Sequence, residues 1–241
     1  MLNGQSRHSR IKLFCQRILT NDQVDRFEIL ARLCLDDGQI IPASTWISQI
    51  VACPQLSVQF DWFIISQILA KRPVNVQVWL NCLPVTLSDS AFAERFNQRV
   101  KASLWHTEQI CIEVGEHADP SSDRTQLRQT LQRLAQMGYQ IALDDYGKRA
   151  SDVEAILSYP LDWVKLTGET LRYGESVAFS NFVETLQIYL RRQQLGLIVE
   201  WVETPEQKAL LDNLRVHGLQ GNLIQPPHPW SLLGQTGQVD Q

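Results

Sequence analysis

Polar side chains with oxygen donors recur where the short apolar runs of this sequence end. Near the ends of successive runs lie Asn81, Glu113, Asp144, Asp145, Lys165, Glu200 and Gln220, and Glu28 lies near the start of an earlier run. Several carboxylates gathered at one place would repel each other and raise their own pKa values. Divalent cations remove that repulsion, and all-oxygen ligands suit Mg²⁺ or Mn²⁺ better than Zn²⁺. Adjacent carboxylates such as Asp144 and Asp145 can flank two ions, an arrangement used for in-line displacement at phosphorus.

Each of these residues also has an ordinary interpretation when it is taken alone. A single Glu at a strand end is usually a solvated loop residue, Lys165 could form a salt bridge at a rim, and Asp144–Asp145 could cap a helix. The recurrence over five or more successive runs favours a metal-centred site. The sequence contains no GxSxG, GxxxxGK, GxGxxG or HExxH motif, which disfavours a serine hydrolase, a P-loop enzyme or a zincin.

Short apolar runs alternate with longer amphipathic segments along the chain, which indicates strands alternating with helices. The expected strands are residues 11–19, 27–35, 76–81, 109–114, 139–145, 162–166, 195–200 and 219–224. The expected helices are residues 43–71, 88–102, 123–138, 151–158, 176–194 and 204–216. About eight strands with intervening helices predict an α/β fold of the closed (β/α)₈ TIM-barrel type.

The first two expected strands depart from that alternation. Only TNDQVD (20–25) separates them, which is hairpin spacing and too short for a crossover helix. We therefore expect one antiparallel pair in an otherwise parallel barrel. The barrel is expected to form a single domain with a core at about 12–230 and a flexible tail after it.

Composition limits the class of protein and its compartment. The 241 residues include 22 Lys+Arg and 26 Asp+Glu, a net charge of −4, which argues against DNA or general nucleic-acid binding. The five cysteines show no metal-ligand spacing, and we interpret them as buried thiols of a reducing compartment. The first residues lack the apolar segment of a signal peptide, and no stretch suits a membrane span. We expect a cytoplasmic protein.

Taken in order, the motifs resemble those of the EAL-domain family of cyclic-di-GMP phosphodiesterases over about residues 12–230. FEILAR (27–32) is similar to the family's name-giving E-x-L-x-R segment, with Ile29 in place of its alanine. GYQIALDDYG (138–147) is close to the family's most specific stretch. The further matches are IIPASTWI (40–47), LNCL (80–83), IEVGE (112–116), VKL (164–166), IVEWVETPEQ (198–207) and LQGNLIQPP (219–227).

The resemblance implies a barrel with one antiparallel strand near its start and the hydrolysis of cyclic di-GMP to linear pGpG with Mg²⁺ or Mn²⁺. The ligands that it implies for the first ion are Glu28, Asn81, Glu113 and Asp144. For the second ion they are Asp144, Asp145 and Glu200. The resemblance also implies a homodimer.

Other residues receive catalytic, binding or structural roles from the same resemblance. Glu200 would deprotonate or orient the attacking water, and Lys165 would stabilise that water or the charge that develops at phosphorus. Gln220 would help to position the nucleophile, and Arg32 would pair with a substrate phosphate. Two further matching carboxylates, expected to be structural, are Glu116 and Glu203.

Three departures from the family pattern lie close to these residues. The family's glycine-rich loop is replaced by YGKRASD (146–152), which brings in Lys148 and Arg149. Thr167 stands where the family has an aspartate, and Trp201 replaces a small glycine, where its indole could crowd the pocket.

Three functions are compatible with the sequence. The first is a working phosphodiesterase, favoured because a barrel kept only as a scaffold has no need of mutually repelling carboxylates. The second is a catalytically inactive EAL protein that binds cyclic di-GMP as a receptor or binds a protein partner. The third is an unrelated barrel that uses a metal to stabilise an enolate.

Overall fold

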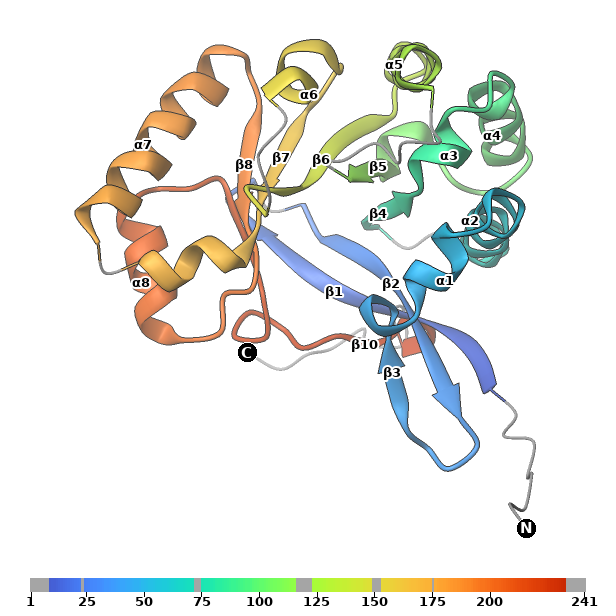
Figure 1. Cartoon of the computed structure of the whole chain (residues 1–241), viewed down its shortest axis with the longest axis horizontal. Coiled ribbons are helices and arrows are strands. Elements are labelled where there is room, and N and C mark those ends of the chain that lie inside the picture. Colours follow the sequence, from blue (N-terminus) through green and yellow to red (C-terminus); the bar gives the residue numbers. More distant parts are fainter. Residues whose placement is uncertain are drawn as a thin grey trace.

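The computed structural model describes residues 9–22, 24–71, 75–115, 123–148, 153–174 and 176–232. Strands at the centre of the molecule close into a barrel, and helices surround them (Figure 1). The barrel strands are β1 (Ser9–Thr20), β2 (Arg26–Leu35), β4 (Gln77–Cys82), β5 (Ile110–Gly115), β6 (Gln140–Tyr146), β7 (Trp163–Leu166), β8 (Gly196–Val199) and β9 (Gly218–Gln220). The predicted α/β barrel is confirmed.

Strand β1 closes the barrel and is antiparallel to both of its neighbours. It pairs with β2 from Ser9↔Leu35 to Ile18↔Arg26, and its other edge pairs with β9 from Ile18↔Gln220 to Thr20↔Gly218. The remaining neighbours in the barrel, from β2 through β4 to β9, are parallel. The expectation of one antiparallel pair therefore becomes one antiparallel strand with two antiparallel partners.

Strands β1 and β2 are longer than the barrel needs, and their far ends leave it as a ribbon (Figure 1). Two short strands, absent from the sequence prediction, extend the sheet there: β3 (Ile40–Pro42) pairs with β2, and β10 (His228–Pro229) pairs with β1. Because the second half of β2 lies outside the barrel, the barrel mouth crosses β2 near its start. This places Glu28 at the mouth although it is only the third residue of its strand.

The helices are α1 (Ile47–Val51), α2 (Pro54–Leu69), α3 (Pro84–Leu87), α4 (Phe92–Lys101), α5 (Arg124–Gln136), α6 (Val153–Ser158), α7 (Val177–Arg192) and α8 (Pro205–Asn213). The single helix expected over 43–71 is divided at Pro54, because a residue before proline favours extended backbone, as Cys53 does. Helix α8 begins at Pro205 as predicted, with a capping box between Thr204 and Gln207. Helix α3 was not predicted.

The last barrel strand ends earlier than expected, at Gln220 rather than residue 224. Gly221 passes so close to the chain at Val202 that a Cβ atom on it would lie 2.2 Å from the Val202 carbonyl oxygen. The amide of Leu223 then donates to that same carbonyl at 3.0 Å. The contact between the two loops, which the apolar pattern of LQGNLI does not encode, stops the strand.

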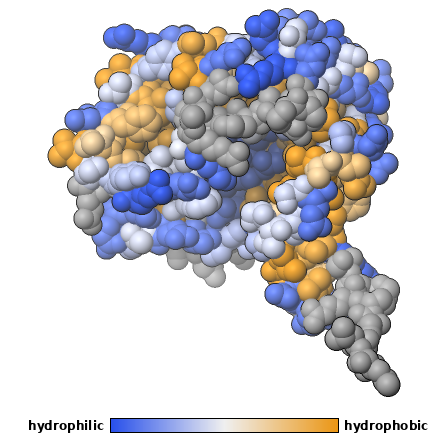
Figure 2. All heavy atoms as spheres, viewed as in Figure 1, coloured by the Kyte–Doolittle hydropathy of each residue, from blue (hydrophilic) through white to orange (hydrophobic). Residues whose placement is uncertain are grey.

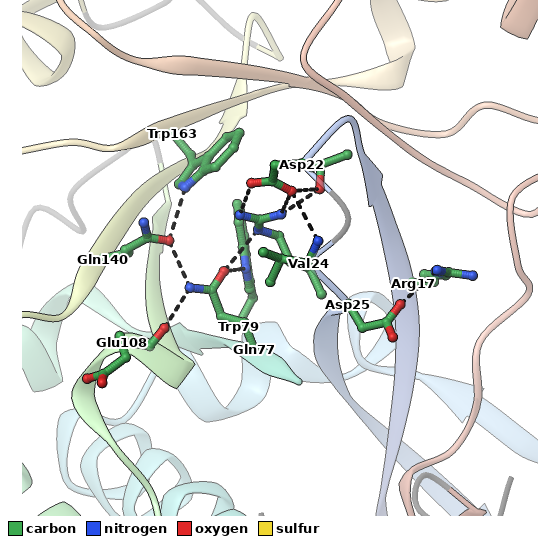
Figure 3. Close-up of polar contacts among 11 residues, drawn as sticks. Arg17, Asp22, Val24, Asp25, Gln77, Trp79, Glu108, Gln140 and Trp163 are labelled. Atoms are coloured by element: carbon green, nitrogen blue, oxygen red, sulfur yellow. Dashed lines mark hydrogen bonds and ion pairs between the residues drawn. The ribbon is translucent and has the colours of Figure 1, made fainter. Parts of the chain in front are cut away.

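The other end of the barrel is closed by a polar network at the starts of the strands (Figure 3). Gln77 Nε2 donates to Gln140 Oε1 and to the carbonyl of Glu108, both at 2.9 Å. The Trp163 indole donates to Gln140 Oε1 at 3.2 Å, and buried Arg26 donates to Gln77 Oε1 at 3.0 Å. These bonds satisfy polar groups at this end, and the larger cavity described below lies at the opposite mouth.

The structure bears on two expectations, that the cysteines are buried free thiols and that the chain has no membrane span. Cys15, Cys82 and Cys111 are buried and unpaired as expected, whereas Cys34 and Cys53 are only partly buried. Among the helices that the structure describes, none combines the length and the apolar character that crossing a membrane requires.

Candidate functional site

Alternation along the strands explains why the polar residues share one layer of the barrel interior. Successive side chains of a strand point to opposite faces, so residues two apart point the same way. A buried layer inside the barrel contains Ile18, Trp79, Cys111, Ala142 and Ile198. Two residues further toward the mouth lie Gln16, Asn81, Glu113 and Asp144 on the same strands, and Glu200 directly after β8. The polar candidate residues therefore form one layer of the barrel interior, and the apolar layer lies beneath it.

Lys165 lies at the centre of that layer and is 0% exposed. Its ammonium nitrogen is 3.0 Å from Glu28 Oε2, 3.1 Å from Glu113 Oε1, 3.1 Å from Asp144 Oδ1 and 3.0 Å from Glu200 Oε1. Four carboxylates thus converge on one cation, three of them from β2, β5 and β6 and the fourth, Glu200, from the residue that directly follows β8. The four carboxylates and Lys165 are called the Lys165 cluster below.

Glu28 connects the Lys165 cluster to the amides around it. Its Oε1 accepts from Asn81 Nδ2 at 2.8 Å, and its Oε2 accepts from Gln220 Nε2 at 2.6 Å. Gln220 Nε2 also lies 3.2 Å from Gln16 Oε1, on the antiparallel strand β1. The predicted residues Asn81 and Gln220 are therefore brought to the cluster, and Gln16, opposite Glu28 in the β1–β2 register, joins them.

One ammonium does not balance the negative charge of the cluster. Burial, reinforced by the neighbouring carboxylates, raises the pKa of Glu113 well above its usual range. Burial also raises the pKa of Asp144, and it raises the pKa of Glu200 to about 8. Burial acts in the same direction on Glu28, but Lys165 and the two amide donors outweigh it and lower the pKa. Three of the four carboxylates therefore favour an additional positive charge nearby.

Asp145 follows Asp144 in sequence but does not join the Lys165 cluster. The β6–β7 register shifts between Leu143 and Tyr146, and Asp145 has a left-handed backbone with φ 60°. A bulge of this kind re-aims a side chain at the end of a strand. Asp145 Oδ2 instead lies 3.0 Å from Lys148 Nζ.

A cavity of about 1390 Å³ opens above the cluster. Its polar part is lined by Glu28, Asn81, Asp144, Asp145, Lys148, Glu200 and Gln220. Its other part runs past Arg32 to apolar residues of α1 and α2, among them Ile47, Val51 and Phe60. Figure 2 shows the mouth as a hollow with hydrophilic residues inside it and hydrophobic residues at one side. Acidic, cationic and apolar surfaces thus meet in one hollow.

The EAL domain family model matches residues 2–227, nearly the whole chain. The chain belongs to the EAL-domain family.

Relatives and solved structures agree with this assignment. The chain is 27% identical over 224 residues to the probable cyclic di-GMP phosphodiesterase PdeA of Escherichia coli, and 25% identical over 210 residues to the cyclic di-GMP phosphodiesterase PdeF of the same organism. These alignments cover 90% and 84% of this chain but only 30% and 28% of the relatives, so the chain spans about a third of their length.

Among solved structures, the fold is similar to the FimX EAL domain of Pseudomonas aeruginosa, crystallised with c-di-GMP. The TM-score is 0.79 and the sequence identity 23%, with 90% of each chain covered. At this identity the likeness concerns the fold.

The oxygen donors of this EAL domain fit a hard divalent cation in their chemistry. Four carboxylates and an amide lie together, and Glu113 Oε2 and Glu200 Oε2 are buried without accepting a hydrogen bond in the described part of the chain. No three His, Cys, Asp or Glu side chains in that part are already arranged around a common metal position, because the carboxylates close on Lys165 instead. A cation would be coordinated by carboxylate oxygens that do not contact Lys165, such as Glu113 Oε2 and Glu200 Oε2.

The departures from the EAL pattern change the wall of the cavity. Trp201, which also has a left-handed backbone (φ 57°), keeps 52% of its surface exposed and lines the cavity beside Glu200. Its Cβ packs on Gly168, where an added Cβ would lie only 2.2 Å away. Thr167 is buried, and its hydroxyl caps the 3-10 helix Gly168–Tyr173. Trp201 is therefore accommodated beside the cluster, and Thr167 supplies no carboxylate to it.

Two cavity residues were missed by the sequence analysis of this EAL domain. Gln16 could have been found from the sequence, because it is a polar residue two positions before Ile18 in an apolar run, where the side chain faces the interior. Asp61 lies in the middle of α2, where an aspartate normally faces water, and nothing in the sequence marks it as buried. Of the predicted features, Glu116 and Arg149 lie outside the described residues, as does the chain after residue 232.

Asp61 should make stability depend on pH. Its Oδ2 accepts from the amide of Leu83 at 2.9 Å, yet burial raises its pKa to about 7, against about 3.8 in an exposed aspartate. Between those values the folded chain holds a proton that the unfolded chain has released, so this residue's contribution to stability falls as pH rises from about 4 to 7. The difference between the folded and the unfolded pKa corresponds to a loss of unfolding free energy on the order of 4 kcal/mol.

We therefore expect Asp61→Asn, compared with the wild type, to gain stability as pH rises from about 4 to 7, and the gain to level off above pH 7. Urea unfolding in chelator at several pH values measures the difference between the two proteins, so other titrating groups cancel. A difference that stays constant across that range would contradict the prediction.

Proposed function

We propose that this EAL domain hydrolyses cyclic di-GMP to linear pGpG with a divalent cation, Mg²⁺ or Mn²⁺. The observation that carries the proposal is the convergence of Glu28, Glu113, Asp144 and Glu200 on Lys165 at the floor of a large cavity. A structural barrel gains no stability from burying four carboxylates against one ammonium. Selection for binding and chemistry accounts for such an arrangement.

Cyclic di-GMP combines two phosphodiesters with two purine bases, and the cavity offers surfaces for each. Phosphate oxygens suit the polar end, where Arg32 can form charge-assisted hydrogen bonds with one of them. Purine bases suit the apolar end, lined by Ile47, Val51 and Phe60. The exposed indole of Trp201 adds a flat surface to the cavity wall.

In this proposal the ligands of the divalent cation are Glu28, Asn81, Glu113 and Asp144, and Asp145 is the ligand that a second ion would need. When bound, the divalent ion supplies charge neutralisation at the phosphodiester and a more acidic water. Buried beneath the ligands, Lys165 holds the carboxylates together and keeps a positive charge next to them.

Bond-making in the proposed reaction is simple. Water adds to one phosphorus, one P–O bond of the ring breaks, and the chain opens to pGpG. Glu200 would accept the proton from water through its Oε2, which is buried and accepts no hydrogen bond in the described part of the chain. Gln220, fixed by Glu28 and Gln16, orients the water, and the leaving oxygen takes a proton from solvent.

Hydrolysis of cyclic di-GMP by the purified chain with Mg²⁺ or Mn²⁺, followed by chromatography of pGpG, tests the proposal. We expect turnover by the wild type and a loss of at least about 100-fold in Glu28→Gln, because Glu28 is both a ligand and the partner of Lys165, Asn81 and Gln220. Glu184→Gln, an exposed position on α7, is the control and should keep the wild-type rate. Absence of pGpG with either ion at high enzyme concentration would refute the activity.

A second function, a cyclic-di-GMP receptor without hydrolysis, is favoured by one specific feature. Lys148 forms an ion pair with Asp145, which reduces the negative charge available to a second ion. Calorimetry with cyclic di-GMP, in chelator and then in Mg²⁺, separates the two functions. Binding without turnover supports the receptor, and no binding at all points to a protein partner.

We also propose a cytoplasmic location, since all five cysteines are free thiols and a reducing compartment preserves such thiols. The homodimer implied by the family resemblance stays a prediction, which light scattering on the purified chain can test.

A further inference from the structure

Lys148 and Asp145 form a half-exposed ion pair on the wall of the cavity. The side chains are 39% and 37% exposed, and Lys148 Nζ lies 3.0 Å from Asp145 Oδ2. The turn that joins them adds a backbone hydrogen bond, from the Lys148 amide to the Asp145 carbonyl at 3.1 Å. The same short turn therefore holds the ammonium beside the carboxylate through both backbone and side chain.

Lys148 also lies in the electrostatic field of two more carboxylates. Asp145 interacts with it most strongly, and Glu169 and Asp144 attract it as well. Asp144 belongs to the Lys165 cluster, and Lys148, Asp144 and Asp145 line the same cavity. A positive charge is thus already supplied there by the chain itself.

The ligands left for a second ion are few. Asp145 is engaged by Lys148, and Thr167 offers a buried hydroxyl that caps a 3-10 helix. Asp144 and Glu200 are both held by Lys165 within the cluster. A divalent ion that competed for Asp145 would have to displace Lys148 and would then meet its repelled ammonium nearby.

We propose that Lys148 takes the place of a second metal ion at Asp145, so that this EAL domain binds one divalent cation per chain. The inference rests on the proposed function, in which the first ion is held by Glu28, Asn81, Glu113 and Asp144. An ammonium differs from a metal ion in what it does there. It neutralises Asp145 and a bound phosphate, but it has no open coordination position for water.

The number of Mn²⁺ ions bound per chain tests this inference without measuring catalysis. Free Mn²⁺ can be followed by electron paramagnetic resonance during titration of the metal-free protein. We expect one ion for the wild type and two for Lys148→Met, which keeps an unbranched side chain one atom shorter and removes its charge. Lys148→Arg restores a cation at this place and should return the number to one.

Lys208→Met is a matched control, because Lys208 is 39% exposed and pairs with Asp212 four residues along α8. It should bind one ion, like the wild type. Two ions in the wild type, or one in Lys148→Met, would overturn the inference and leave the proposed phosphodiesterase standing. No Mn²⁺ bound by any variant at millimolar concentration would overturn both.

Discussion

Replacing Lys165 by methionine should destabilise the metal-free protein by about 3–5 kcal/mol, the cost of removing one partner from a buried ion pair. Lys165 is 0% exposed and is the only cation within ion-pair distance of Glu28, Glu113, Asp144 and Glu200 in the described residues. Methionine fills a similar volume, so the loss would come from unbalanced charge rather than from a cavity. Urea unfolding in chelator measures it, and hydrolysis should fall by at least about 100-fold.

Two further measurements separate charge from packing in that result. Mn²⁺ should restore part of the stability of Lys165→Met, since a divalent ion can replace the missing cation among the same oxygens. The double variant Lys165→Met with Glu113→Gln should be less destabilised than Lys165→Met alone, because one of the repelling carboxylates is neutral. A loss below about 1 kcal/mol in the single variant would contradict the central position of Lys165.

Glu113→Gln should act in opposite directions on stability and on metal binding. Glu113 is buried, its pKa is raised by burial and by its acidic neighbours, and its Oε2 accepts no hydrogen bond in the described chain. Glutamine has the same shape without the charge, so the metal-free protein should gain about 1–2 kcal/mol. The affinity for Mn²⁺ should drop by at least about 10- to 100-fold, because an amide oxygen is a much weaker ligand than a carboxylate.

Unfolding in chelator and Mn²⁺ titration of the same preparation test both parts of this prediction. Glu184→Gln, which removes an exposed carboxylate from α7, should change neither quantity. If Glu113→Gln weakened the metal-free fold, the carboxylate would be stabilising its surroundings, and the interpretation of the cluster as a site built at the expense of stability would be wrong.

The barrel could be predicted because its strands have a simple pattern. Runs such as QICIEV (109–114) and LGLIVE (195–200) are apolar except near their ends, and the spacing between the first two runs allows only a hairpin. The period of two residues in a strand then fixes that Glu113 and Glu200 face the interior together with Cys111 and Ile198. Local sequence was therefore enough to find the fold and most of the candidate ligands.

Contacts between segments far apart in sequence determine the features that the apolar pattern did not predict. Strand β2 continues past the barrel as a ribbon, so the position of Glu28 at the mouth depends on where β4 pairs with β2. The end of β9 depends on the approach of Gly221 to Val202. Burial of Asp61 depends on how α2 packs against the turn after β4, because its partner is the amide of Leu83.

By itself the sequence determined that carboxylates, an amide and a lysine end successive barrel strands, because alternation and strand order are local properties of the chain. Tertiary structure decided which of those residues contact Lys165 and which contact other partners. The bulge in β6 separates Asp144, which faces Lys165, from Asp145, which faces Lys148. Electrostatic partners are set by distances of about 3 Å between segments far apart in sequence, and such distances exist only once the barrel has closed.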